Sequence, residues 1–303
     1  MSIHSSICIV SYNRKAELKL TLEKILERID TDTEVIVGLD GCSDGSIDLK
    51  SDFPNVIWME FPNHVGASTA RRAIYEKAKG DYIFGFDDDS HPVTEDFIEK
   101  AIQTFRENNS LGIVAFRIFN GIQLPESQLM DMGIGSSYAC SEFAGCGYAI
   151  TRKAYEATGG FPDWMNIYGE EAYVSLRAFE CGYRLIYEPS ILVHHRVDRQ
   201  ARKSEGYQKF RFGLQLRNNL VLFLNLYPFP MNIRSCIKCV LHNMYKYGFK
   251  SISWHMLFLR SLRNSFSTTL KITENKIPAA VLNEWMKLPL PVFDWCPNKS
   301  SHA

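Results

Sequence analysis

The chain has 303 residues, which is enough for one large domain or for one domain with a smaller appendage. Hydrophobic residues make up 46% of it and charged residues 22%, as in an ordinary globular protein. Its 34 Lys and Arg residues balance its 34 Asp and Glu residues, so no global field attracts nucleic acid or an anionic membrane, and any phosphate recognition must be local.

The sequence favours a cytoplasmic protein. Residues 1–6 lack the charged segment and long apolar run of a signal peptide. The longest apolar candidate for a membrane span, Leu220–Leu226, contains Asn225 and is followed by Pro228. Eight scattered cysteines in a chain large enough to build a core predict free thiols in a reducing compartment. We expect no transmembrane segment, with peripheral contact at the inner face of a membrane left open.

Strands and helices are predicted to alternate in the first half of the chain. Helical spacing of apolar residues lies at 18–29, 67–78 and 97–105. Strands are expected at Ser6–Val10, Glu34–Leu39, Val56–Phe61, Asp81–Phe86 and Ile113–Phe119. Repeated β-α-β units of this length imply an α/β fold with a mainly parallel sheet and helices on both faces.

The second half of the chain is less regular. The segment 121–138 has no clear period, a strand is expected at Ala144–Ile150 and a helix at Glu170–Cys181, and 185–187 and 191–194 are expected to be extended. Three further helices are predicted at Phe210–Leu226, Asn232–Lys246 and Ser251–Ser267. The change in character places a domain boundary near residue 200.

Polar side chains follow the expected strands where each strand ends. These groups are 11–14, 40–46, 63–66 with Arg71 and Arg72 just beyond, and 87–89. In an open α/β sheet, ligands bind beyond the carboxyl ends of the strands. We therefore expect these groups to line one edge of the sheet.

Three consecutive aspartates, Asp87, Asp88 and Asp89, are the sharpest of these signals. Adjacent like charges are unfavourable unless something positive offsets them, and Mg²⁺ or Mn²⁺ prefers carboxylate oxygens and often bridges to substrate phosphates. Alternation along a strand predicts Asp87 and Asp89 on one side and Asp88 on the other. The alternative is an acidic cluster that caps the segment after Pro92, although a cap needs only one carboxylate.

The run from Ile7 to His195 resembles the family 2 glycosyltransferases with the GT-A fold. The segments that carry the resemblance are Val10–Arg14, Asp40–Ser46, Asn63–Arg71, Gly80–Pro92, Gly159–Phe161 and Gly169–Arg177. Each segment is weak alone, but their order and spacing are specific. The resemblance implies a GT-A catalytic domain over residues 1–200, with nucleotide-sugar binding in 1–120 and the acceptor and base region in 121–200. A C-terminal helical region would occupy 201–303.

The resemblance also implies a metal-dependent hexosyltransferase with Mn²⁺ or Mg²⁺ as cofactor and a nucleotide-diphosphate sugar, preferably a UDP-sugar, as donor. Asp89 and His194 would hold the metal, although a structural role for His194 is an equal alternative. His194 and His195 alternate sides if extended, so both are not expected to serve. The implied nucleotide-sugar-binding residues are Ser11, Arg14, Asp40, Arg71, Asp87 and Asp88.

An inverting transferase needs a carboxylate that takes the proton of the attacking acceptor hydroxyl. The resemblance places it in the pair Glu170-Glu171, where the family has Glu-Asp. Glu171 matches the aspartate position but is one methylene longer, so Glu170 stays the substitute. Both residues could instead stabilise the helix start electrostatically. Trp164 is the candidate for acceptor binding, because aromatic faces stack on sugar rings.

The acceptor is a saccharide, a lipid-linked molecule or another hydroxyl compound, and the resemblance points to the synthesis of surface polysaccharides or glycoconjugates. For the C-terminal helices, the zero net charge favours packing on the catalytic domain over contact with a membrane surface. Two rival functions remain. One is a sugar-phosphate nucleotidyltransferase, which releases pyrophosphate, and the other is a non-catalytic nucleotide-sugar binding module.

Overall fold

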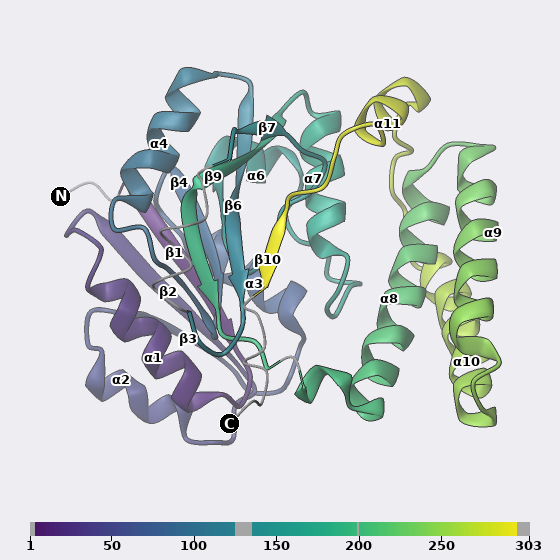
Figure 1. The fold of residues 1–303 in the computed structure, drawn as a ribbon, viewed down its shortest axis with the longest axis horizontal. Helices are drawn as coiled ribbons and strands as arrows, with labels where there is room; N and C mark the ends of the chain where they lie inside the picture. Colours follow the sequence, from purple (N-terminus) through teal and green to yellow (C-terminus); the bar gives the residue numbers. More distant parts are fainter. Residues whose placement is uncertain (1–3, 125–134, 199, 296–303) are drawn as a thin grey trace, which may run out of the picture.

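The computed structural model describes residues 4–124, 135–198 and 200–295, so part of the irregular segment 121–138 lies outside the described residues. A mixed β-sheet forms the centre of the molecule, and the helices α8, α9 and α10 stand beside it at one end (Figure 1). Along its main path the strands lie in the order β3-β2-β1-β4-β8-β6-β9-β5. The α/β fold with C-terminal helices is confirmed.

The N-terminal half of the sheet is parallel. β1 pairs with both β2 and β4, and β2 pairs with β3. β8 then runs antiparallel between β4 and β6, and β9 runs parallel to β6. The strands are β1 (Ser5–Ser11), β2 (Thr33–Asp40), β3 (Ile57–Phe61), β4 (Tyr82–Asp87), β5 (Ser90–Pro92), β6 (Leu111–Asn120), β7 (Tyr138–Ala139), β8 (Tyr148–Thr151), β9 (Arg184–His195) and β10 (Phe293–Trp295).

Helices cover both faces of the sheet because successive side chains of a strand point to opposite faces. Ile7 and Ile9 of β1 pack in one core with α1 and α4, whereas Cys8 packs in the other with α3, α6 and α7. The helices around the sheet are α1 (Lys15–Leu26), α2 (Leu49–Asp52), α3 (Ala67–Lys77), α4 (Phe97–Glu107), α6 (Arg152–Ala157) and α7 (Glu170–Glu180).

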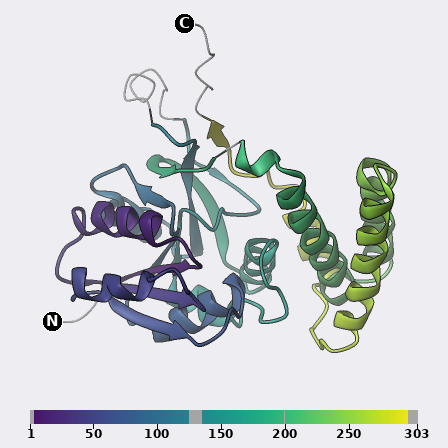
Figure 2. The ribbon, with the colours of Figure 1, turned by 90° about the horizontal axis from the view of Figure 1, so that it is seen from below.

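The C-terminal helices build a small core of their own. They are α8 (Glu205–Leu226), α9 (Met231–Asn243) and α10 (Ile252–Thr269), with a π-helical turn at Met244–Gly248 after α9. Phe212, Leu216 and Leu220 of α8 pack there against Trp254 and Phe258 of α10. α8 lies between the sheet and the other two helices (Figure 2). No helix in the described ranges is both long and apolar enough to cross a bilayer.

The last described residues return to the sheet. α11 (Ala279–Trp285) contacts α7, and β10 pairs in parallel with β6. The indole Nε1 of Trp285 donates to the carbonyl of Ser141 at 2.8 Å, which fixes α11 beside the sheet. The C-terminal region is therefore helical only in part, and the boundary near residue 200 stays a prediction.

One expected strand differs in a way that matters for the site. β8 begins at Tyr148, not at Ala144, and residues 144–147 form a turn closed by a bridge between Ala144 and Gly147. Gly147 faces Ile118 and Val193, where a methyl group would lie 2.6 Å from Ile118. The turn therefore packs closely on the sheet. A straight strand through residues 144–147 would have placed their side chains beyond the candidate site.

Candidate active site

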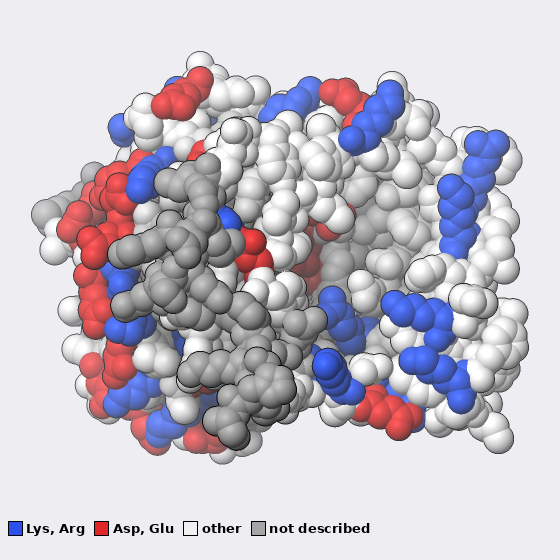
Figure 3. Space-filling view, in the orientation of Figure 1, with Lys and Arg blue, Asp and Glu red and all other residues white. Residues whose placement is uncertain are grey.

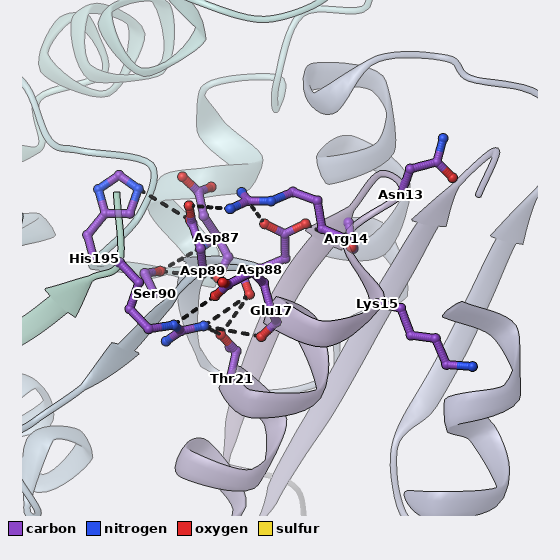
Figure 4. Close-up of polar contacts among 12 residues, drawn as sticks. Asn13, Arg14, Lys15, Glu17, Thr21, Asp87, Asp88, Asp89, Ser90 and His195 are labelled. Carbon is purple, nitrogen blue, oxygen red and sulfur yellow. Dashed lines mark hydrogen bonds and ion pairs between the residues drawn. The ribbon is translucent and has the colours of Figure 1, made fainter. Parts of the chain in front are cut away.

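The acidic cluster lies at the carboxyl end of β4 and is held by Arg14 (Figure 4). The guanidinium of Arg14 donates to Asp88 Oδ1 and to Asp89 Oδ2, each at 2.8 Å. Ser11 Oγ donates to Asp88 Oδ2 at 2.8 Å. β4 ends at Asp87, and Asp88 and Asp89 form a turn. The expected alternation of the three carboxylates therefore does not hold, and one arginine faces two of them.

Burial and hydrogen bonding act differently on the two carboxyl groups that Arg14 contacts. Burial raises the pKa of Asp88 to about 7, although the Arg14 charge lowers it. Burial also acts to raise the pKa of Asp89, but hydrogen bonds from His195 and Arg14 hold it well below its usual range. Asp89 is therefore the more firmly ionised of the pair.

His195, rather than His194, faces these carboxylates. Its Nε2 lies 3.3 Å from Asp89 Oδ1, and Figure 4 shows the ring pointing toward the aspartates. The Nε2 of His194 instead lies 2.7 Å from the carbonyl of Gly121, with its ring against His91. Because both histidines belong to β9, alternation sends them to opposite sides. The structure thus places His195, not the predicted His194, beside the acidic cluster, and a metal role for either histidine stays a prediction.

A divalent cation fits the donor atoms around His195. Asp87, Cys146 and His195 each offer a ligand atom within 4.8 Å of the others. The Nδ1 of His195 donates to Asn120 Oδ1 at 2.9 Å, since an amide oxygen only accepts, which aims Nε2 at the cluster. Metal-binding histidines are commonly oriented in this way. Carboxylate and imidazole suit Mn²⁺, whereas the thiol of Cys146 is softer than a hard cation prefers.

Arg71 joins the acidic cluster to the predicted base. Its guanidinium donates to Asp87 and, at 3.0 Å, to Glu170 Oε1, and it lies 3.9 Å from Glu171 Oε1. Arg72 points elsewhere and pairs with Glu76 and Asp163 at the surface. Of the two neighbouring arginines, only Arg71 reaches the cluster, as the 100° step of a helix predicts.

The two glutamates at the start of α7 differ in accessibility. The side chain of Glu170 is 2% exposed and that of Glu171 is 24% exposed. Burial raises the pKa of Glu170 to about 8, and it raises the pKa of Glu171 although the Arg71 charge opposes it. Glu171 lines the large cavity beside the acidic cluster, and Glu170 does not. Accessibility therefore favours Glu171 as the group that meets a substrate.

Gly145 lets the chain approach this pair closely. The Cβ of an alanine there would lie 2.6 Å from Glu171 Oε1 and 2.9 Å from Arg71 Nη2. Real Cβ atoms essentially never come so close, so the carboxylate and the guanidinium would have to move. The turn 144–147 therefore forms one wall of the site.

α8 fixes the loop that precedes α7. Asn218 Nδ2 donates to the carbonyls of Ile167 and Tyr168 at 2.9 and 2.8 Å, and Arg217 donates to the carbonyl of Trp164 at 2.7 Å. Tyr168 has φ 74°, which is unfavourable for a bulky residue and needs such support. The C-terminal helix thus positions the start of the helix that carries Glu171.

Asp40 holds the loop after β3. Its carboxylate accepts from the backbone N–H of Val65 at 2.7 Å and of Gly66 at 3.0 Å, and the Nδ1 of His64 lies 2.9 Å away. The ring of His64 stacks on Tyr12 with centroids 4.1 Å apart. Asp40 is 1% exposed, so its first task is to shape this loop, and its predicted contact with a base stays a prediction.

Trp164 lies away from the large cavity. It lines a second pocket together with Arg72, Phe161 and Glu274. Its indole packs edge to face on Tyr173 with centroids 6.0 Å apart. The position does not support the predicted acceptor contact, because no wall of the cavity that holds Glu171 includes Trp164.

The large cavity, of about 790 Å³, opens between the sheet and α8. Figure 3 shows a hollow at this place, with Lys and Arg side chains gathered below it. Asp87, Glu171 and His195 are among the residues that line it. Tyr168, Arg202, Tyr207 and Arg211 also line it.

Sequence reasoning missed several of these residues. Asn120, Cys146 and Gly145 match none of the motifs. Arg202 and Arg211 lie beyond the expected boundary of the domain. Two signals were available: Asn120 ends a predicted strand within one residue, and a Gly-Cys-Gly run interrupts an otherwise apolar strand pattern, which typically marks a close backbone approach.

The fold is shared with solved structures of nucleotide-sugar enzymes. A mannosyltransferase from Pyrobaculum calidifontis in complex with GDP-Man and Mn²⁺ superposes with a TM-score of 0.58 at 16% identity, over 95% of this chain and 88% of that one. GalNAc-T7 with UDP, GalNAc and Mn²⁺ gives 0.63 at 17%, over 96% and 59%. S. aureus TarS 1-349 in complex with UDP-GlcNAc gives 0.60 at 12%, over 92% and 82%. The protein thus has the GT-A fold of glycosyltransferases.

The amino-acid sequence also shows which family the chain belongs to. Residues 6–170, more than half of the chain, match the profile of glycosyl transferase family 2, and the protein belongs to that family. A curated relative from Haemophilus influenzae, described as an uncharacterized glycosyltransferase, is 31% identical over 111 residues. That match covers 36% of this chain and 37% of the relative.

Proposed function

We propose that the protein is an inverting, metal-dependent hexosyltransferase that moves a sugar from a nucleotide-diphosphate sugar to an acceptor hydroxyl. The observation that carries the proposal is the shared cavity of Asp87, His195 and Glu171, with Arg71 between the acidic cluster and the base. Donor and acceptor would meet in this cavity, with the cation site on one side of them and the carboxylate of Glu171 on the other.

On the donor side, Ser11, Arg14, Asp40, Arg71, Asp87 and Asp88 form the proposed nucleotide-sugar site. Asp87, Asp89 and His195 would hold Mn²⁺ or Mg²⁺. A bound divalent ion would neutralise charge on the departing diphosphate. Two of the solved structures with the same fold contain Mn²⁺ together with GDP-Man or with UDP and GalNAc, which supports a divalent ion here. UDP-sugars are the favoured donors.

On the acceptor side, the proposed step is a displacement with Glu171 as base. The acceptor oxygen forms a bond to the anomeric carbon while the bond from that carbon to the diphosphate oxygen breaks. The hydroxyl proton passes to the Glu171 carboxylate, and the nucleoside diphosphate leaves with the bonding electrons. Attack from the face opposite the leaving group inverts the anomeric centre. Glu170, buried against Arg71, positions that arginine.

The lining of the cavity by Tyr168, Tyr207 and Arg211 supports an acceptor site different from Trp164. Arg211 lies over the ring of Tyr168 at 5.1 Å, and the hydroxyl of Tyr168 donates to that of Tyr207 at 3.3 Å. Aromatic rings that are held in place stack well on sugar rings. We propose Tyr168, Tyr207 and Arg211 as acceptor contacts, with Arg202 beside them.

A thermal-shift screen of nucleotide sugars with and without Mn²⁺ tests the proposal, because a ligand that binds only the native state stabilises it. We expect a selective, Mn²⁺-dependent rise in melting temperature with one donor. The products then separate the rivals. Release of a nucleoside diphosphate supports transfer, release of pyrophosphate from a nucleoside triphosphate supports a nucleotidyltransferase, and binding without turnover supports a non-catalytic module.

The biological setting is part of the proposal. Seven described cysteines are free thiols, which supports a reducing, cytoplasmic location. Saccharide or lipid-linked acceptors, and a place in the synthesis of surface polysaccharides or glycoconjugates, follow from family membership alone.

A further inference from the structure

The zero net charge of the chain conceals a strong separation of charge. Residues 206–273, which hold nearly all of α8 and the whole of α9 and α10, contain ten Lys or Arg residues and no Asp or Glu. The rest of the chain therefore carries a net charge of −10. The basic residues of the segment are Lys209, Arg211, Arg217, Arg234, Lys238, Lys246, Lys250, Arg260, Arg263 and Lys271, and eight of them are exposed, all but Lys209 and Arg217.

The same helices expose large apolar side chains in regular rows. On α9, Ile233, Ile237 and Leu241 are 44%, 53% and 60% exposed and lie four residues apart. On α10 and at the residue that follows it, the exposed apolar residues are Ile252, Met256, Leu259, Phe266 and Leu270. Steps of four, three, seven and four residues keep the α10 set on one side of the helix. We call these two rows together the outer helix face.

Basic side chains lie within and beside the outer helix face. Arg263 stands seven residues before Leu270 and seven after Met256, inside the α10 row, and Arg234 and Lys238 each follow an apolar residue of the α9 row. Lys and Arg at such places lay their carbon stems along an apolar surface while the charge stays in water. Figure 3 shows white atoms with scattered blue groups over this end of the molecule.

We propose that the outer helix face docks on a bilayer surface rich in anionic lipid. Exposed apolar rows of this kind seldom remain bare on a monomer, and rows of apolar side chains flanked by cations are typical of helices that lie in the membrane interface. Anionic headgroups complement the eight exposed cations of this segment. Pairing of this face with the same face of a second copy does not, because it would bring two such cationic segments together.

The position of this face suits an enzyme at a membrane. α9 and α10 stand at the end of the molecule far from the sheet (Figures 1 and 2). A groove lined by Lys246 and Tyr247 shares Arg211 and Tyr207 with the large cavity. A lipid-anchored acceptor would thus have a path from the docked surface to Glu171. That path rests on the proposed function, whereas the docking itself does not.

Vesicle sedimentation of the full chain, without donor or acceptor, tests the docking. We expect binding to vesicles of phosphatidylglycerol mixed with phosphatidylcholine, weaker binding at high NaCl, and little binding to phosphatidylcholine alone. Ile237→Ser/Leu241→Ser and, separately, Arg260→Glu/Arg263→Glu should each lower the partition coefficient at least about tenfold.

Matched controls change similar side chains elsewhere. Leu20→Ser/Ile122→Ser removes exposed apolar groups, and Lys77→Glu/Lys153→Glu reverses two exposed charges outside the helical end. Both should bind vesicles like the original chain. Equal binding to both lipid mixtures, equal binding by all variants, or a dimer in analytical ultracentrifugation that Ile237→Ser/Leu241→Ser dissociates, would each overturn the proposal. Donor-induced thermal shifts, measured separately, report on the proposed function alone.

Discussion

Arg71 donates to Glu170 at 3.0 Å across 99 positions of sequence, and both side chains are almost fully buried. The same guanidinium contacts Asp87. One arginine on α3 thus joins the end of β4 to the start of α7, the two places where the proposed chemistry needs fixed geometry.

Breaking this contact should cost stability. Above the Glu170 pKa of about 8, Arg71→Met leaves the carboxylate of Glu170 buried without a cation, and we expect a loss of about 3–5 kcal/mol in the free energy of unfolding there. Urea unfolding measures it. Arg71→Met/Glu170→Leu should recover much of the loss, because the buried carboxylate of Glu170 is then absent as well. If the double variant is as unstable as the single one, the ion pair is not the cause.

Glu171→Gln should remove catalysis and leave binding intact. The amide cannot take the hydroxyl proton, so we expect a fall in turnover of at least about 100-fold. Release of nucleoside diphosphate measures turnover, and the donor-induced thermal shift measures binding. Glu99→Gln, on the exposed side of α4, serves as the control. Full turnover by the Glu171 variant would remove that residue from the role of base.

Gly145→Ala should lower the rate without unfolding the protein. The added methyl group would meet the ends of two flexible side chains, Glu171 and Arg71, at 2.6 and 2.9 Å. The stability cost is therefore small, but a displacement of the base by about 1 Å can cost up to about 100-fold in rate. Gly206→Ala, where nothing lies within 4 Å, is the matched control. An unchanged rate for Gly145→Ala would show that the turn at residue 145 does not hold Glu171 in a fixed position.

Substitutions of the two histidines should differ in their effect on Mn²⁺ binding. We expect His195→Asn to lose Mn²⁺ binding measured by calorimetry, and His194→Asn to retain it. Asn120→Ala should weaken Mn²⁺ binding about 10–100-fold, because Asn120 orients the imidazole of His195. The reverse order, with His194→Asn the weaker binder, would contradict the assignment.

Glu142 should make the folded state less stable as the pH rises. Burial, and then the charge of Glu171, raise the pKa of Glu142 to about 7. The folded state therefore holds this proton more tightly than the unfolded state, and stability is lost between about pH 4.5 and 7. Glu142→Gln should flatten that decline by no more than about 2 kcal/mol, since the side chain is partly exposed. Urea midpoints at both ends of the range measure it.

Much of the fold could be predicted from the sequence, because the patterns that indicate strands and helices are local. The alternation of strand and helix in the first half is confirmed. The helix that begins at Glu170 and Glu171 and the C-terminal helices are confirmed as well. Each depends on the period of apolar residues within a short window. The short strands β5, β7 and β10 and the helix α11 carry too few residues for such a period, and they were not predicted.

By itself, the sequence determined the family, the α/β sheet and the acidic end of β4, because motif order and hydrophobic period are properties of the chain alone. Tertiary structure decided which histidine faces the carboxylates, that Arg14 holds two aspartates at once, and that Asn120, Gly145 and Arg211 enter the site. These relations join residues far apart in sequence through pairing register, turns and close packing. No local pattern of residues encodes distances of that kind.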